Sequence, residues 1–208
     1  MAPEILFRRA KKVENEQQIR RKVRNAYSAA AEHPQDEHVF PVGRKFAESL
    51  GYTQEWIAGL PRAAVDAFAG VSNVSVFARI SEGAAVLDLG CGAGLDSLIA
   101  ARRTGHRGRV IGVDFSQAMI ERAGLGSAEA GVRNVIYCRA DAENLPVQTE
   151  SIDTALVNGI FNLNPAREAI FRELARVVRR GGAVYAAELI LERPLPLQEC
   201  RRESNWFA

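Results

Sequence analysis

The order of apolar and polar residues divides this chain of 208 residues into two regions with different patterns. Up to about residue 80, apolar positions recur at the spacing of amphipathic helices. The clearest such face contains Ile19, Val23, Tyr27 and Ala30. From Ala84 onward, short apolar runs alternate with helical segments, which favours a mostly parallel sheet covered on both faces. We therefore expect a helical N-terminal extension or lid over residues 1–80 and an α/β domain over residues 81–208.

The same pattern, together with residues that start or stop helices, sets the individual elements. Expected strands are Ala85–Leu89, Val110–Asp114, Val135–Arg139, Thr154–Asn158 and Ala183–Leu191. Expected helices are Gly43–Leu50, Thr53–Leu60, Arg62–Phe68, Leu95–Thr104, Gln117–Gly131 and Pro165–Arg180. For the last helix, Asn164 can cap the start and Gly181-Gly182 can end it. These elements predict a Rossmann-like, doubly wound sheet.

Composition and charge narrow the function classes. Apolar residues make up 47% of the chain and charged residues 25%, as in an ordinary soluble globule. The net charge of +2 is too small to favour nucleic acid or a membrane surface as a partner. The basic runs Arg8–Lys12 and Arg20–Arg24 predict a solvated helix face, because no aromatic residues interleave and Glu14 and Glu16 dilute the charge.

Targeting signals and metal-ligand spacings are not recognisable in the sequence. No apolar run has the length of a membrane span, and the N-terminal residues lack a secretory pattern, so we expect a cytoplasmic protein. The three cysteines are odd in number and far apart, which predicts neither a disulfide framework nor a zinc site. They are Cys91, Cys138 and Cys200.

Candidate chemistry is concentrated in the turn Gly90-Cys-Gly-Ala-Gly94, between an expected strand and an expected helix. Glycines let the backbone turn tightly and come close to a ligand, because no Cβ stands in the way. Unpaired N–H groups at the start of the following helix point into the same turn. Asp114, at the end of the next strand, is placed to accept hydrogen bonds from both hydroxyls of a ribose. The arrangement predicts a nucleoside-containing cofactor.

Three details favour S-adenosylmethionine (SAM) over NAD. The spacing is Gly-x-Gly-x-Gly, whereas the dinucleotide fingerprint is Gly-x-Gly-x-x-Gly. Asp88, two residues before the first glycine, would repel a pyrophosphate and suits the cationic amino-acid end of SAM. The segment Asp141–Glu143 follows the third strand, where it can meet the edge of an adenine. Acidic residues at three strand ends favour a sulfonium-bearing donor, and an NAD-dependent oxidoreductase is the less favoured alternative.

Four segments resemble the successive motifs of class I SAM-dependent methyltransferases. They are Val86–Gly94, Gly112–Ser116, Asp141–Pro146 and Val178–Gly182. The resemblance covers about residues 84–192 and implies the fold of that family, SAM as cofactor and methyl transfer as the activity.

The resemblance also implies a role for each matching position. The glycine turn would surround the methionine part of SAM, and Asp114 would hold the ribose. Phe115 and Met119 would flank the adenine, whose edge Asp141–Glu143 would contact. Asn158–Gly159 would line the opening toward the acceptor. The predicted cofactor site contains Asp88, Gly90, Cys91, Gly92, Gly94, Asp114, Phe115, Met119, Asp141, Ala142, Glu143, Asn158 and Gly159.

A closer resemblance connects the chain with the arsenite methyltransferase branch. It is carried by Gly51–Trp56, Leu60–Arg62, Asn158–Pro165 and Glu188–Pro196. That branch binds trivalent arsenic through cysteines, one after the Leu-Pro pair and one just after the fourth strand. Here Arg62–Asn73 contains no cysteine, and Gly159 stands at the second position. The scaffold is shared, but these arsenic ligands are not.

The predicted function is therefore transfer of a methyl group from SAM to a small-molecule acceptor. The sulfonium is already a good leaving group, so the protein must mainly align acceptor, methyl carbon and sulfur. We find no convincing general base, which favours a soft nucleophile such as a thiolate, selenolate or arsenite. No catalytic residue is assigned.

The C-terminal sequence suggests an alternative function. Only 17 residues follow Leu191, whereas class I methyltransferases usually add two further strands there. A truncated SAM-binding remnant without turnover is therefore the alternative. An uncovered sheet edge tends to pair with another strand, so a homodimer or coverage by the N-terminal helices is expected.

Overall fold

The computed structural model describes the backbone of residues 2–190 and of residue 192, with side chains from Glu16 onward. In this part of the chain, five parallel strands form a sheet in the order β3-β2-β1-β4-β5. The strands are β1 (Ala85–Leu89), β2 (Arg109–Asp114), β3 (Val135–Arg139), β4 (Ile152–Asn158) and β5 (Val178–Ala187). The order reverses between β1 and β4, which creates a crevice at their carboxyl ends. The expected Rossmann-like, doubly wound fold is confirmed.

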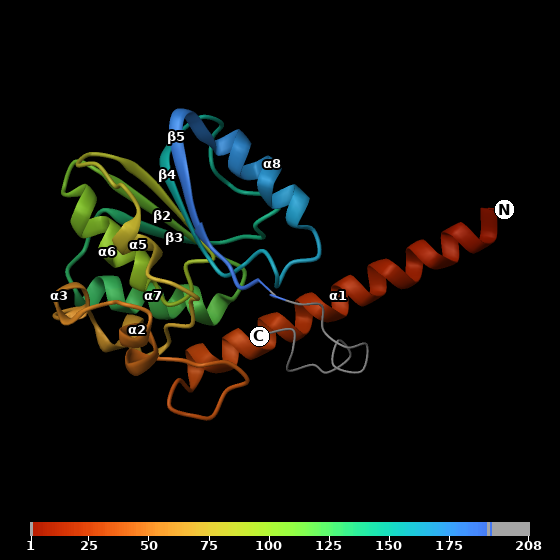
Figure 1. Ribbon diagram of the computed structural model, residues 1–208, viewed down its shortest axis with the longest axis horizontal. Coiled ribbons are helices and arrows are strands. Elements are labelled where there is room, and N and C mark those ends of the chain that lie inside the picture. The colour runs from red at the N-terminus through yellow and green to blue at the C-terminus, as the bar shows by residue number, and fades with distance from the viewer. Residues whose placement is uncertain (1, 191, 193–208) are drawn as a thin grey trace.

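Helices cover both faces of the sheet (Figure 1). The helices that follow β1, β2 and β4 are α6 (Leu95–Thr104), α7 (Gln117–Glu129) and α8 (Arg167–Val177). Successive residues of a strand point to opposite faces, and β1 shows the result. Val86 packs with Ala100 of α6, whereas Leu87 packs with Ile170 of α8. Two apolar layers therefore fix the sheet between α6 and α8.

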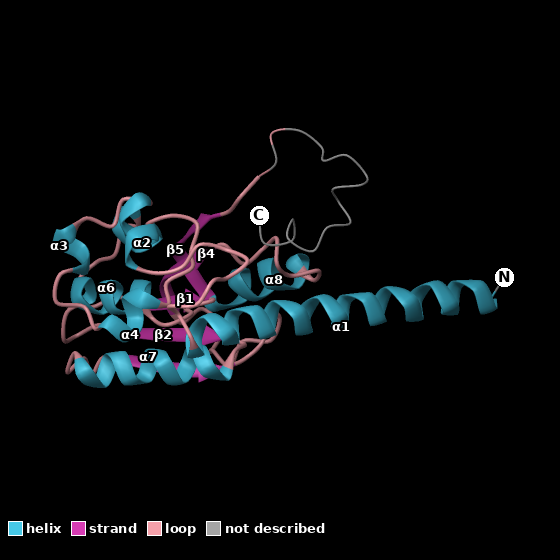
Figure 2. Cartoon of the chain, turned by 90° about the horizontal axis from the view of Figure 1, so that it is seen from below, coloured by secondary structure: helices cyan, strands magenta, loops and turns pink. Residues whose placement is uncertain are grey.

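Five helices precede the sheet. They are α1 (Ala2–Glu32), α2 (Arg44–Ser49), α3 (Gln54–Ile57), α4 (Arg62–Asp66) and α5 (Val74–Phe77). Figure 2 shows the N-terminal part of α1 projecting beyond the body, while its C-terminal part lies along α7. Arg122 of α7 joins two of these segments, because its guanidinium donates to the carbonyls of Ala31 and Ala63, each at 2.7 Å. None of the described helices has the length and hydropathy needed to cross a membrane.

Several element boundaries differ from the sequence-based expectation, most of all at the junction of α8 and β5. Gly181 and Gly182 do not end α8: β5 already begins at Val178, and both glycines lie within the strand. Gly181 has φ of 78°, and the pairing with β4 is irregular between Ile152 and Thr154. The glycines thus accommodate an irregular strand start. The short helix α5 was not predicted.

The expected start of α8 is wrong, because the helix begins at Arg167 and its N-cap is Ala166, without a side-chain cap hydrogen bond. Asn164 instead accepts a hydrogen bond from the backbone N–H of Ala166 at 2.8 Å, just before the helix.

Other expectations lie outside the described residues. The expected lack of strands after Leu191 concerns residues that the structure does not describe, as does Cys200.

The packing of α8 gives a stability prediction. Ile170 is fully buried in the layer beneath α8, so Ile170→Ala should lower the free energy of unfolding by about 2–5 kcal/mol. Urea titration followed by circular dichroism measures this loss. Ile136→Ala is the control, because Ile136 of β3 is 64% exposed, and we expect a loss below about 1 kcal/mol. Equal losses in both variants would contradict the role of α8 in closing this face.

Candidate functional site

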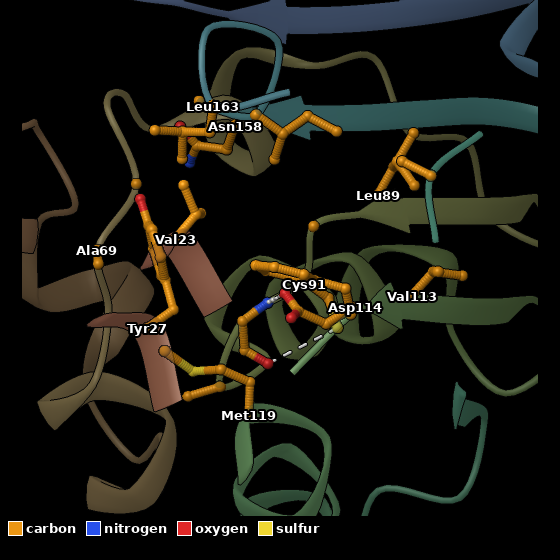
Figure 3. A pocket seen from close by; sticks show the side chains of 18 of the residues that line it. Val23, Tyr27, Ala69, Leu89, Cys91, Val113, Asp114, Met119, Asn158 and Leu163 are labelled. Atoms are coloured by element: carbon orange, nitrogen blue, oxygen red, sulfur yellow. Dashed lines mark hydrogen bonds between the residues drawn. The ribbon is translucent and has the colours of Figure 1, made fainter. Parts of the chain in front are cut away.

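A cavity of about 1060 Å³, including its mouth, opens at the carboxyl ends of the strands. In Figure 3, Asn158 and Leu163 lie toward one end of this cavity, and Asp114 and Cys91 toward the other. Eleven of the thirteen predicted cofactor-site residues line it: Gly90, Cys91, Gly92, Asp114, Phe115, Met119, Asp141, Ala142, Glu143, Asn158 and Gly159. The other two, Asp88 and Gly94, do not line it.

The glycine turn has the backbone geometry that its sequence predicts. Gly90, Gly92 and Gly94 have φ of 76°, 52° and 87°, a region that side chains rarely adopt. A Cβ on Gly90 would come within 2.3 Å of Ile160 Cγ2, and one on Gly94 within 2.6 Å of the Tyr137 hydroxyl oxygen. A side chain is therefore excluded at both ends of the turn, which keeps its backbone open toward the cavity.

Asp114 joins this turn to the end of β2. Its carboxylate accepts hydrogen bonds from the backbone N–H of Gly92 at 3.0 Å (Figure 3) and from that of Ser116 at 2.8 Å. The side chain is only 7% exposed, and burial raises its pKa to about 6, although the backbone hydrogen bonds act in the opposite direction. The backbone N–H of Phe115 also acts on this carboxyl, and Asp114 lines the cavity, where a ligand can reach it.

Asp88 lies behind the cavity wall. It is 2% exposed, and Ser97 of α6 donates a hydrogen bond to its carboxylate at 2.5 Å. Burial raises the pKa of Asp88, and the nearby carboxyl of Asp96 raises it further. The structure therefore places Asp88 as a link between β1 and the first turn of α6.

The described part of α1 contributes a wall that the sequence analysis did not assign. Arg20, Val23, Arg24 and Tyr27 all line the cavity. Arg20 forms an ion pair with Glu143, and the Arg24 guanidinium lies 5.5 Å from the centre of the Phe115 ring. Arg21, Lys22 and Arg24 are exposed, as expected for a solvated face, whereas Arg20 is partly buried against Glu143. The signal was the helical spacing of the four residues, which places them in one stripe.

The cavity wall offers few groups that could take a proton from an acceptor. Burial raises the pKa of the Cys91 thiol well above its ordinary value, so the sulfur stays protonated. Burial also raises the pKa of Tyr27, so its hydroxyl is not a base. Among the described residues, no group of three or more His, Cys, Asp or Glu side chains is arranged to hold a metal.

The sequence matches a known family over most of the sheet region. Residues 80–207 match the family described as a methyltransferase domain. With the parallel sheet and the cavity at its switch point, this match shows that the chain belongs to the class I SAM-dependent methyltransferases, and SAM is its cofactor.

Particular relatives extend this result. An arsenite methyltransferase of Halobacterium salinarum is 36% identical over 150 residues, which cover 72% of this chain and 38% of the relative. A demethylmenaquinone methyltransferase of Desulfitobacterium hafniense is 37% identical over 109 residues, or 51% of this chain and 43% of the relative. An arsenic(III) S-adenosylmethionine methyltransferase structure from Chlamydomonas reinhardtii matches with a TM-score of 0.60 and 28% identity, over 68% of this chain and 51% of that one. The chain thus spans less than half the length of both sequence relatives.

The pH dependence of protein stability tests the raised pKa of Asp114. Between the ordinary pKa of 3.8 and about 6, the unfolded carboxyl is ionised while the folded one keeps its proton. The folded state therefore loses stability as the pH rises through this interval. Asp114→Asn removes the dependence, so the variant should gain up to about 1.4 kcal/mol per pH unit relative to wild type. Urea unfolding at several pH values measures the difference.

Asp153 serves as a control of opposite sign. A backbone hydrogen bond from Ala85 and the ion pair with Arg179 lower its pKa. Its contribution to stability is therefore present above the ordinary pKa and is lost as the pH falls. If the difference in unfolding free energy between Asp114→Asn and wild type stayed constant from about pH 4 to about pH 6, the raised pKa of Asp114 would be contradicted.

Proposed function

We propose that this protein transfers the methyl group of SAM to a small soft nucleophile, with residues 81–208 binding the donor and residues 1–80 covering it. The observation that supports it most is the pairing of a donor end that contains Asp114 and the segment Asp141–Glu143 with an acceptor end lined mostly by apolar side chains. SAM is cationic at its sulfonium and amino groups, and buried carboxylates favour such a ligand.

The donor end of the cavity suits the nucleoside. Asp114 lines the cavity, and its carboxylate can accept hydrogen bonds from the ribose hydroxyls. The ring of Phe115 and the side chain of Met119 lie beside it for contact with the adenine, and Asp141–Glu143 supplies polar groups for the adenine edge. The open backbone of the glycine turn leaves room for the methionine part.

The acceptor end is mostly apolar. Phe68, Ala69, Ile160 and Leu163 line it, and Asn158 is the polar side chain that Figure 3 shows there. An acceptor that must lose a proton during attack would need a general base. The raised pKa values of Cys91 and Tyr27 make both poor bases. The carboxyl of Asp96 also lines the cavity, but it is already engaged by hydrogen bonds from Tyr52, Ser75 and Asn158. A thiolate, a selenolate or a trivalent arsenical carries a reactive lone pair without that step. Alignment of such a nucleophile with the sulfonium is then the main catalytic contribution.

The geometry at Gly159 argues against arsenic ligation by a side chain at this position. A Cβ there would come within 2.8 Å of Val71 Cγ1, so the backbone packs directly on the neighbouring loop. An arsenical acceptor would therefore enter already bound to small thiols, as a free soft nucleophile.

Asp114→Ala tests the donor site. A hydrogen bond to a charged group contributes about 1.5–3 kcal/mol, so the variant should bind SAM at least about tenfold more weakly in isothermal titration calorimetry. Asp153→Ala is the matched control, because this aspartate also accepts a backbone hydrogen bond beside β1 but does not line the cavity. Unchanged affinity in Asp114→Ala would exclude the proposed ribose contact.

Labelled SAM tests the acceptor class. We expect transfer of label to a small thiol or to arsenite in the presence of thiol, and no transfer to a quinol whose hydroxyl must first be deprotonated. Transfer to the quinol alone would overturn the soft-nucleophile proposal. Binding of SAM without transfer to any of the three would favour a cofactor-binding protein without turnover.

A further inference from the structure

The side chain of Asn158, at the end of β4, is fully engaged by protein groups. Its amide oxygen accepts hydrogen bonds from the backbone N–H of Val71 at 2.8 Å and of Ser72 at 3.1 Å. Its amide nitrogen donates to the Ser72 carbonyl at 2.7 Å and to Asp96 Oδ2 at 2.9 Å. Both lone pairs of the oxygen and both protons of the nitrogen therefore have partners.

Asp96, which accepts one of these hydrogen bonds, also accepts hydrogen bonds from other elements. It is 5% exposed in the first turn of α6, and it accepts hydrogen bonds from the Tyr52 hydroxyl at 2.5 Å and from the Ser75 hydroxyl. The backbone N–H of Ser75 lies 3.3 Å from the same oxygen. One carboxylate thus joins α6 to the segment after α2, to α5 and, through Asn158, to β4. Removal of one partner would leave a buried charge short of donors.

The segment that these bonds hold is the loop Gly70–Asn73. Gly70 lines the cavity beside Ala69, and Asn73 donates to the Gly51 carbonyl at 3.2 Å. Val71 packs against Gly159, where a Cβ would not fit. The loop therefore contacts the chain after β4 through both a polar and an apolar contact. Gly70 brings this loop to the cavity wall beside Asn158, where a Cβ on Gly70 would come within 2.5 Å of the Asn158 amide nitrogen.

We infer that Asp96 and Asn158 form a positioning pair for the acceptor, and that Asn158 does not hold SAM. The inference rests on the proposed function in one respect, namely that the acceptor enters at this end. The pair fixes the loop Gly70–Asn73 against β4, and the loop in turn fixes where the acceptor lies relative to the donor methyl group. Small displacements matter here, because alignment of the reacting atoms is the main demand of methyl transfer.

Two variants break the pair in different ways. Asn158→Ala removes all four hydrogen bonds of the amide. Asp96→Asn keeps the size of the side chain but sets an amide nitrogen or a weaker oxygen against Asn158. Asn158 cannot rotate its amide to compensate, because its oxygen is fixed by the N–H groups of Val71 and Ser72. Both variants should therefore loosen the loop Gly70–Asn73. If both give the same result, a folding defect in one of them does not explain it.

Asn134→Ala is the matched structural control. The Asn134 amide nitrogen lies within hydrogen-bond distance of the Ala101 carbonyl, the Thr104 hydroxyl and the Gly105 carbonyl, at 3.1, 3.3 and 3.0 Å. These groups belong to the other end of α6, and Asn134 does not line the cavity. The control loses a comparable set of bonds without touching the loop Gly70–Asn73.

The first measurement is hydrogen–deuterium exchange of the peptide that contains residues 69–73, paired with calorimetry using S-adenosylhomocysteine. In Asn158→Ala and Asp96→Asn, we expect exchange of this peptide to rise at least about tenfold, while affinity for S-adenosylhomocysteine stays within about threefold. Asn134→Ala should leave both unchanged. Unaltered exchange, or a loss of affinity above about tenfold in Asn158→Ala, would overturn the inference.

The second measurement uses whichever probe acceptor the wild type methylates, with small thiol and arsenite as the first choices. A positioning pair predicts a rise in the acceptor KM or a fall in kcat of at least about tenfold, with the KM for SAM within about threefold. Equal changes in the KM values for the acceptor and for SAM would indicate a general structural role. They would contradict the proposed positioning role of Asp96 and Asn158. If the wild type methylates none of the probes, the proposed function fails, while exchange and calorimetry still decide whether Asn158 holds the loop or the donor.

Discussion

Burial of carboxyl groups beside the glycine turn is the constraint on which much of this structure depends. Asp88, Asp96 and Asp114 are 2%, 5% and 7% exposed, and desolvation raises the pKa of all three. A buried carboxyl is costly unless neighbouring groups donate hydrogen bonds to it. The donors come from different elements: Ser97 within α6, Tyr52 and Ser75 from the N-terminal region, Asn158 from β4, and Gly92 from the turn. Satisfying these groups therefore ties the elements around the cavity together.

This dependence makes the N-terminal helices part of the site. Tyr52 is fully buried, and its hydroxyl reaches a carboxylate of the sheet region across more than forty residues of sequence. Arg20 and the Ser28 hydroxyl connect α1 to Glu143 and Ser116, which belong to the loops after β3 and β2. A division of the chain near residue 80 describes the change in pattern, but the hydrogen bonds cross that boundary.

The sequence predicted best those features that depend on neighbouring residues. The bounds of β1, β3 and α6 agree with the expectation to the residue, because Gly94 and Gly105 flank α6 and apolar runs mark the strands. The start of β5 was missed, since Gly181-Gly182 has the same local signature whether it ends a helix or bends a strand. The contacts of Arg20 and Asp96 could not be foreseen, because each depends on a partner that only the fold brings near. Local signals predicted most of the residues that line the Asp114 end of the cavity, whereas the other end is assembled from distant segments.

The same carboxyl groups suggest how donor and product are distinguished. SAM carries a sulfonium charge that S-adenosylhomocysteine lacks, and charges interact strongly where water is largely excluded. Asp114 lines the cavity and has a pKa of about 6, so it is ionised near neutral pH and favours a cation. This attraction would favour the donor over the product, because the sulfur becomes neutral when the methyl group leaves. In the proposed function the remaining task is the alignment of the acceptor, and we assign this task to the loop Gly70–Asn73, which is held by Asn158 and, through it, by Asp96.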